Sequence, residues 1–208
     1  MNRFLFRSVF FSIMSTTAMI LASHAVAQNS SEFSLLATPE VLNSEEGEVL
    51  QVFLPPSWHT VHKEWLDNRG VKEVVPADQT IINWREMLAF QVIDKVRMPP
   101  NAYLDQLKQA LSQSCEFSHF RTLSGSVNSH YSEAVQISWC GQVAGAQWGE
   151  IVLTRIISGE NTLYSLNKSW RTIPFRSVEA IGLPEEEIQF WLNQVNRSRL
   201  CDTRRNDC

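Results

Sequence analysis

Alternating apolar and polar side chains predict two β-strands in the middle of the chain. Residues 83–93 place one set of side chains on one face, Trp84, Leu88, Phe90 and Val92, and the other set on the opposite face, Arg85, Met87, Ala89 and Gln91. Residues 131–140 repeat this period of two with Val135, Ile137 and Trp139. A period of two is the repeat of a strand with one buried face, so both segments are predicted to lie in a sheet.

Two further segments, residues 150–157 and 162–171, flank the loop Ser158-Gly159-Glu160-Asn161. This pattern predicts a β-hairpin, with Gly159 providing the positive φ that a tight reversal needs. In the second arm we expect one face to point inward, Tyr164, Leu166, Lys168 and Trp170. We expect the opposite face to be solvated, Ser165, Asn167 and Ser169.

Two segments have helical periodicity. Residues 101–115 carry an apolar stripe, Leu104, Leu107, Leu111 and Cys115, after Asn101 as a possible cap. Residues 184–199 begin with Pro184 and three glutamates and carry the stripe Ile188, Trp191, Leu192 and Val195. Acidic residues at the start and Arg197 and Arg199 at the end suit the helix dipole. Two main helices are therefore predicted.

The first half of the chain has shorter patterns. Residues 49–54 and 71–75 are short β-prone runs, Thr38-Pro39-Glu40 resembles the start of a helix, and residues 57–70 look irregular. Strands followed by a helix, a meander and a closing helix predict an α+β fold with an antiparallel sheet packed by the two helices. We expect residues 28–48 to be a polar leader and 49–208 to form a single domain.

The first 27 residues resemble a secretory signal peptide. Arg3 and Arg7 lie near the start, an apolar run covers residues 9–22, and Ala25-Val26-Ala27 offers a cleavage site before Gln28. The run is shorter than the roughly 20 residues of a membrane span, and no later segment resembles one. We expect an exported chain without a transmembrane anchor after cleavage, periplasmic if the source is bacterial and otherwise secreted.

Charge argues against nucleic acid as a partner. Removing residues 1–27 subtracts two arginines from 18 basic residues and nothing from 22 acidic ones, which leaves a net charge of 16 − 22 = −6. Binding to nucleic acid depends on clustered lysine and arginine.

All four cysteines, Cys115, Cys140, Cys201 and Cys208, follow the cleavage site. An even count in an exported chain predicts two disulfides. Three pairings are possible, and we favour Cys115–Cys140 with Cys201–Cys208 because each pair is close in sequence. Zinc is the competing interpretation, but the spacing lacks Cys-x-x-Cys pairs.

The chemistry-bearing residues suggest binding more than catalysis. His59 and His62, with Glu64, could supply ligands to a metal, but two histidines fall short of the usual three or four ligands. Trp58, Trp65 and Trp148 lie on no predicted core stripe and could form a recognition surface. Arg204 and Arg205, between Cys201 and Cys208, could present two ordered cations to an acidic partner. No nucleophile motif is present, and we expect no cofactor.

The chain resembles the secreted PsbP/DcrB-like group. The resemblance lies in Pro-Pro-Ser-Trp at 55–58, the strand ending at Ile93, the helix 101–115 and the hairpin 150–171. It implies a non-catalytic accessory or scaffolding role, in which the protein binds another envelope or secreted protein. Two alternatives remain open: a small exported hydrolase or metal-dependent enzyme that uses His59 and His62, and a carrier of a small apolar ligand. The oligomeric state is also open.

Overall fold

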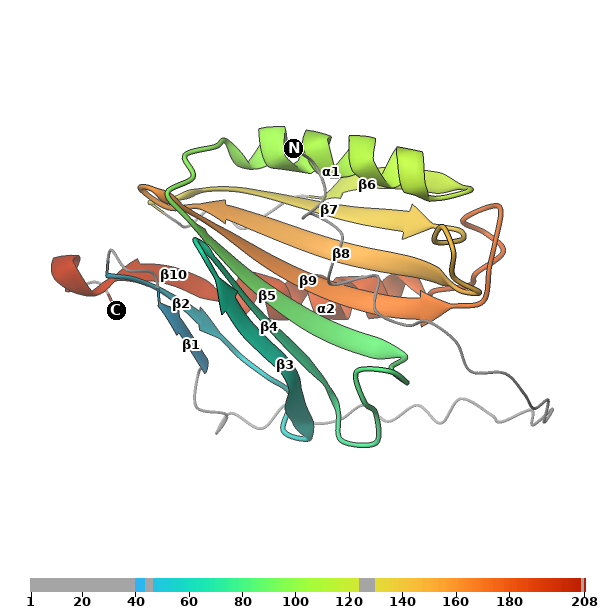
Figure 1. Ribbon diagram of the computed structural model, residues 1–208, viewed down its shortest axis with the longest axis horizontal. Helices are drawn as coiled ribbons and strands as arrows, with labels where there is room; N and C mark the ends of the chain where they lie inside the picture. Colours follow the sequence, from blue (N-terminus) through green and yellow to red (C-terminus); the bar gives the residue numbers. More distant parts are fainter. Residues whose placement is uncertain (1–39, 44–46, 124–129, 207) are drawn as a thin grey trace. The chain divides into compact units, whose positions relative to one another are not determined.

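The protein is built on a seven-stranded antiparallel sheet, seen in a computed structural model that describes residues 40–43, 47–123, 130–206 and 208. Its strand order is β3-β4-β5-β9-β8-β7-β6 (Figure 1). The strands are β3 (Trp58–Leu66), β4 (Arg69–Pro76), β5 (Glu86–Asp94), β6 (Ser118–Leu123), β7 (Ser132–Cys140), β8 (Gly149–Ser158) and β9 (Thr162–Thr172). The predicted α+β class, the strands from 83 and 131 and the 150–171 hairpin are confirmed.

A second, three-stranded sheet joins segments from both ends of the described chain. It contains β1 (Glu40–Asn43), β2 (Glu48–Val52) and β10 (Arg199–Asp202), in the order β1-β2-β10. The helix predicted to start near Glu40 is therefore wrong, because this segment pairs with β2 as a strand. β2 in turn pairs with β10, about 150 residues away, and such a partner cannot be seen in a local pattern. The predicted signal peptide, residues 1–27, lies outside the described residues.

The two helices lie on opposite faces of the main sheet. α1 (Pro100–Ser114) packs Tyr103 and Leu104 against residues of β5, β7, β8 and β9, namely Ile93, Ala134, Ile156 and Leu163. α2 (Glu185–Arg197) packs its predicted stripe, Ile188, Trp191, Leu192 and Val195, on the other face. In Figure 1, α2 lies behind the sheet and α1 runs along the β6–β7 side. Both helices agree with the predicted ranges to within two residues at each end.

The strand β5 corrects one predicted face. Leu88, Phe90 and Val92 lie in the main core beneath α2, as the alternation predicts. Trp84, however, packs with Val75 and Met87 in a separate cluster. Since β5 begins only at Glu86, the period of two does not extend back to Trp84, and the local turn directs that indole to the other face.

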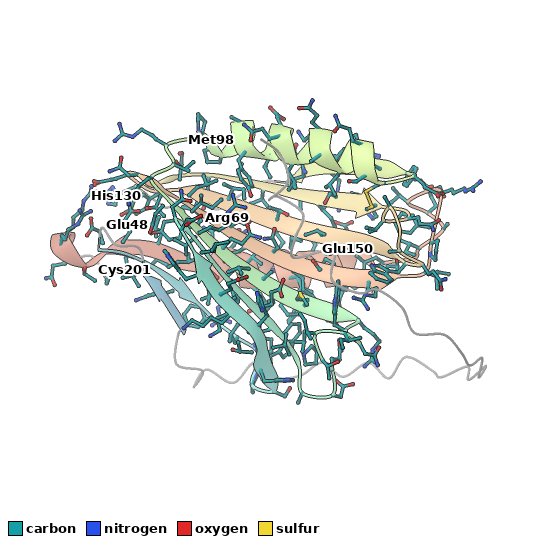
Figure 2. All side chains as sticks on the ribbon, in the orientation of Figure 1. Glu48, Arg69, Met98, His130, Glu150 and Cys201 are labelled. Atoms are coloured by element: carbon teal, nitrogen blue, oxygen red, sulfur yellow. A yellow bond between two sulfur atoms is a disulfide. The ribbon has the colours of Figure 1, made fainter. Side chains whose placement is uncertain are left out.

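The β8–β9 hairpin differs from the prediction at its loop and at its polar face. Gly159 is not among the glycines with positive φ, but a Cβ at this position would overlap the Glu48 carboxylate. Glu48, labelled in Figure 2, accepts hydrogen bonds from the Glu160 backbone N–H at 2.8 Å and the Tyr164 hydroxyl at 3.3 Å. The close approach of the Glu48 carboxylate to the backbone, rather than the conformation of the turn, explains why residue 159 is a glycine. Ser165 and Ser169, predicted to be solvated, are buried.

Lys168 is completely buried beneath α2 and lies within a tryptophan cage formed by Trp58, Trp170 and Trp191. Its Nζ is 5.2, 4.7 and 4.4 Å from the three ring centroids, and it forms an ion pair with Glu86 at 2.6 Å. Burial lowers the pKa of Lys168 to about 8, although Glu86 and Glu187 favour the charged form. Glu187 also accepts hydrogen bonds from the Trp170 and Trp191 indoles, so β9, α2 and the start of β3 meet at one cation.

A second buried cation holds the end of α2. Arg155 on β8 forms an ion pair with Glu133 on β7 at 2.5 Å, and both side chains are less than a tenth exposed. The same guanidinium donates to the carbonyl oxygens of Val195 and Ser198 at 2.6 and 2.7 Å. Val195 lies in the last turn of α2, where its carbonyl also accepts the Ser198 backbone N–H at 3.2 Å, and Ser198 is the residue that follows the helix. Arg155 therefore attaches the last turn of α2 to the sheet.

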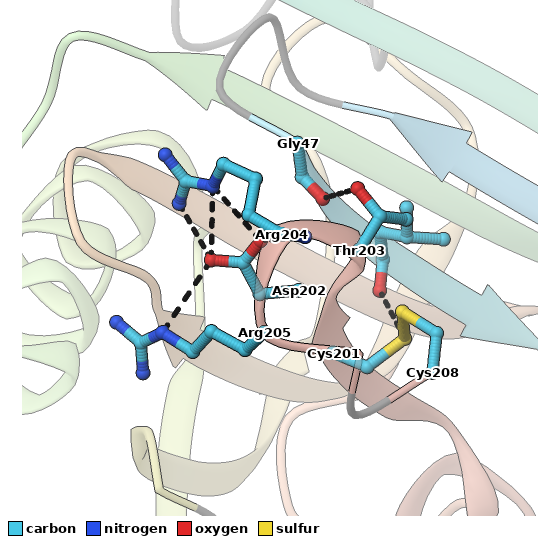
Figure 3. The surroundings of a disulfide bond; sticks show 8 residues. Gly47, Cys201, Asp202, Thr203, Arg204, Arg205 and Cys208 are labelled. Atoms are coloured by element: carbon cyan, nitrogen blue, oxygen red, sulfur yellow. Dashed lines mark hydrogen bonds and ion pairs between the residues drawn. A yellow bond between two sulfur atoms is a disulfide. The ribbon is translucent and has the colours of Figure 1, made fainter.

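Both predicted disulfides are confirmed. Cys115 bonds Cys140 across 25 residues, and Cys201 bonds Cys208 across seven. The first links the end of α1 to the end of β7, whereas the second closes a small ring at the C-terminus (Figure 3). Cys140 is buried and Cys208 is exposed.

We expect Cys140→Ser to lower the free energy of unfolding by about 3 kcal/mol, because it opens the larger loop and leaves a hydroxyl in the core. Cys208→Ser should cost roughly 1 kcal/mol, because only the last few residues are released. Denaturant unfolding of the two variants under oxidising conditions measures both values. Equal losses would show that the core bridge has no special role.

Candidate functional site

The strand β3 is an edge of the main sheet and carries most of the residues that the sequence singled out. It spans nine residues and pairs with β4 on one side, and no strand among the described segments pairs with its other side. Most of its side chains are exposed. The expectation of an irregular segment at 57–70 is therefore wrong. Since both faces of β3 hold polar residues, the usual alternation is absent although the backbone is extended.

A β-bulge in β3 places its two histidines on one face of the sheet. His59 lies opposite Val75 and His62 lies opposite Glu73, with the register shift between Thr60 and His62. The extra residue, Val61, packs on the Val75 cluster of this same face. Without the bulge, residues three apart would point to opposite faces.

This histidine face has an acidic neighbour. His62 Nε2 lies 3.6 Å from Glu64 Oε2, with both side chains well exposed. Burial raises the pKa of Glu73, and the charge of His62 opposes this change. The described part of the chain contains no group of three or more His, Cys, Asp or Glu that could hold a metal ion. The arrangement thus offers a histidine–carboxylate pair at an accessible edge.

Trp65 is the most prominent apolar side chain of the edge. It is 49% exposed, yet its indole N–H donates to the Asp67 carbonyl oxygen at 3.1 Å. Asp67 has a left-handed backbone, φ 53°, which makes the tight turn into β4. The ring lies over Gly70, where an added Cβ would overlap it. Trp65 is therefore held in one orientation while about half of its surface faces solvent.

The face of Trp65 is also cationic. Lys63 lies on this face directly opposite Lys72 of β4, and Trp65 lies opposite Gly70. Lys63 is exposed, whereas Lys72 is only 7% exposed and burial lowers its pKa. Like charges in directly opposed positions destabilise a strand pair. The two faces of the edge thus differ in charge: Lys63 and Lys72 lie on the same face as Trp65, and the histidine–carboxylate pair lies on the opposite face.

Two other predicted surface tryptophans pack within the molecule. Trp58 begins β3 but lies 5.6 Å from the Trp191 ring and belongs to the tryptophan cage of Lys168. Trp148 stacks on the Arg171 guanidinium at 4.4 Å, and Trp84 stacks on it at 4.1 Å. The sequence showed no apolar periodicity that would predict burial of these tryptophans, because the residues they pack against come from distant elements.

Arg204 and Arg205 are both half-exposed and paired within the chain. Arg204 forms ion pairs with Asp202 at 2.6 Å and Glu160 at 3.3 Å, and Arg205 contacts the same two carboxylates. Figure 3 shows the contacts of both arginines with Asp202. The hydrogen bond from Arg204 lowers the pKa of Asp202. These contacts hold the C-terminal ring against the β8–β9 loop, so the arginines are ordered by carboxylates of their own chain.

Comparison with protein-family models gave no match, and comparison with curated proteins gave none. Among solved structures, the chain is similar to the Ran-binding protein Mog1p of Saccharomyces cerevisiae. The two share 11% identity with a TM-score of 0.49, over 80% of this chain and 97% of that chain. At this level the likeness carries no functional argument. No helix in the described ranges is long and apolar enough to span a membrane.

Proposed function

We propose that this protein is an exported, non-catalytic binding protein that takes an extended segment of another envelope or secreted protein onto the outer side of β3. Export is supported by the signal-like residues 1–27 and by the two disulfides, which persist in oxidising compartments. The proposal requires the exported chain to begin at Gln28, which the intact mass of the natural protein measures.

The ordered, half-exposed Trp65 is the observation that carries the binding role. Aromatic residues held rigidly at a surface lose little conformational entropy on binding and are enriched among residues that dominate interface energies. Gly70 and the Asp67 carbonyl provide this rigidity. Beside the indole, the outer side of β3 offers backbone N–H and C=O groups, which an added strand can pair.

The bulge restricts where such a strand can pair. The register of β3 is irregular between Thr60 and His62 and regular from His62 to Leu66. Bulges interrupt a ladder and protect edges from indiscriminate pairing. We therefore place the partner along residues 62–66, with Trp65 near the middle of the contact.

Amide hydrogen exchange on the full exported chain tests this placement. A capped nine-residue peptide of alternating threonine and valine, added in excess, should slow exchange at alternate amides within residues 62–66. Only alternate residues of a strand point their N–H outward, so this pattern distinguishes strand addition from general protection.

Trp65→Ala and Gly70→Ala should each weaken peptide binding about tenfold, the first by removing the anchor and the second by displacing it. Ile173→Ala, which removes a 76% exposed side chain outside β3, should leave binding unchanged. Thermal unfolding of each variant separates lost binding from lost folding. Equal effects of Trp65→Ala and Ile173→Ala, or no protection of β3, would refute the proposed function.

A further inference from the structure

The last two residues of β3 are apolar, and they are exposed on opposite faces of the sheet. Trp65 is 49% exposed and Leu66 is 51% exposed. The register of β3 with β4 is regular here, with Trp65 opposite Gly70 and Leu66 opposite Arg69. Successive residues of a strand point to opposite faces. The edge of the sheet therefore ends with one exposed apolar side chain on each face.

The residues just before this pair have the usual protection of an edge strand, whereas the pair itself does not. His62, Lys63 and Glu64 are polar or charged, and such residues disfavour indiscriminate pairing of an edge. Single apolar residues on a surface are common. Two adjacent ones at an edge that no described strand covers are a liability, because they favour the addition of another strand. Residues 65–66 are thus the part of the edge that suits an apolar partner.

An added strand would contact both exposed side chains at once. Side chains directly opposite each other on paired strands share a face. Two consecutive residues of the partner would therefore lie beside Trp65 and Leu66, one on each face of the sheet. If both are apolar, apolar area is removed from water on both faces. A strand of strictly alternating pattern can supply only one of these two contacts.

We propose that the partner segment carries two consecutive apolar residues, which lie beside Trp65 and Leu66 when the segment adds to residues 62–66 of β3. Consecutive apolar residues are typical of a strand that its own protein buries on both faces. The inference rests on the proposed function and adds the kind of segment that the edge selects.

A second copy of this chain does not provide such a pair. Antiparallel pairing of two identical strands about a two-fold axis puts the central residue opposite itself. A register centred on Glu64 sets Leu66 opposite His62, and one centred on Trp65 sets Leu66 opposite Glu64. A register centred on Leu66 sets Trp65 opposite Asp67. Each of these registers leaves one apolar residue opposite a polar one, so a different chain fits the edge better.

Two capped peptides of identical composition test the inference. In the first, two valines are adjacent (Thr-Ser-Thr-Thr-Val-Val-Thr-Ser-Thr), and in the second, one threonine separates them (Thr-Ser-Thr-Val-Thr-Val-Thr-Ser-Thr). Only the first peptide can place an apolar side chain on each face of the sheet. We expect it to bind the exported chain about tenfold more tightly than the second, as measured by isothermal titration calorimetry.

Leu66→Thr should abolish this preference, because the contact on one face is lost while the contact with Trp65 remains. Ile82→Thr is the matched control, since Ile82 is 68% exposed in the loop between β4 and β5 and lies outside β3. This variant should keep the tenfold preference. Circular dichroism confirms that each variant is folded. A preference that persists in Leu66→Thr would contradict the inference.

The remaining outcomes separate the inference from the proposed function. Equal affinity of the unaltered chain for the two peptides, with protection of alternate β3 amides, would overturn the inference and leave the edge as a binding site. Absence of β3 protection with both peptides would overturn both. Protection in the free protein would also overturn the inference, because the edge would already be covered. The cover would be a second copy if protection depends on concentration, and a segment of this chain if it does not.

Discussion

Replacing Arg155 with methionine should lower the free energy of unfolding by about 3–5 kcal/mol, the usual loss when one partner of a buried ion pair is removed. Glu133 would remain buried without its cation, and the carbonyls of Val195 and Ser198 would lose the hydrogen bonds from the Arg155 guanidinium. Denaturant unfolding at neutral pH measures the change. Because these carbonyls end α2, the variant should also exchange amides faster along that helix.

Arg121→Met is the matched control. Arg121 also forms an ion pair, with Glu185 at 3.0 Å, but both side chains are about half exposed. Exposed pairs are typically worth less than about 1 kcal/mol, so this variant should remain close to wild type. Replacing Arg155 and Glu133 together with methionine and leucine should recover part of the loss, because no uncompensated charge remains. Similar losses for Arg155→Met and Arg121→Met would contradict the role given to burial.

Stability should pass through a minimum near neutral pH, because two buried groups titrate abnormally on either side of it. Burial raises the pKa of Glu150, at the start of β8 (Figure 2), to about 7, with hydrogen bonding to Ser169 and the charge of Arg171 acting in the opposite direction. Burial lowers the pKa of Lys168 to about 8. Each group is therefore harder to charge in the folded chain than in the unfolded one.

The sign follows from proton binding. Between the ordinary carboxyl pKa of 4.5 and about 7, folded Glu150 holds a proton that the unfolded chain has released, so stability falls as pH rises. Between about 8 and the ordinary amine pKa of 10.5, the unfolded chain holds a proton that folded Lys168 has released, so stability rises with pH. Each change amounts to about 3 kcal/mol across its range.

Urea unfolding from pH 4 to 10.5 measures both limbs. Glu150→Gln should reduce the fall in stability between pH 4.5 and about 7 and leave the rise above about pH 8 unchanged. Lys168→Met should reduce the rise above about pH 8 and leave the fall in the acidic range unchanged. Glu73, whose pKa is also raised by burial, adds a smaller fall in the acidic range, so a residual slope in Glu150→Gln is expected. Identical profiles for wild type and both variants would show that neither group titrates as the structure implies.

Strong local patterns predicted much of the fold. The β8–β9 hairpin and the stripe of α2 were recognised because one face of each element is consistently apolar. The edge strand β3 was missed because nothing buries its outer residues and a bulge interrupts its period. The strands β1 and β10 were missed because their pairing with β2 depends on contacts between the two ends of the described chain.

The candidate site was predicted only in its residues. His59, His62 and Trp65 were singled out by residue type, but the residues around them have no alternation from which to predict the face of the strand on which each side chain lies. The structure separates Trp65 from the histidines and sends Trp58 into the core. It also identifies Lys63 and Gly70, which no sequence pattern singled out. Lys63 lies opposite Lys72 of β4, and Gly70 leaves room for the Trp65 ring that lies on it.

By itself the sequence determined the α+β class and the two helices and favoured one of the three pairings of the four cysteines, because period, capping residues and short spacing act within a few turns of chain. Only the tertiary structure decided that β3 is an open edge with one ordered indole, and that Lys168 and Arg155 are buried cations. Burial and exposure depend on which distant elements pack together, and a local pattern does not record that choice.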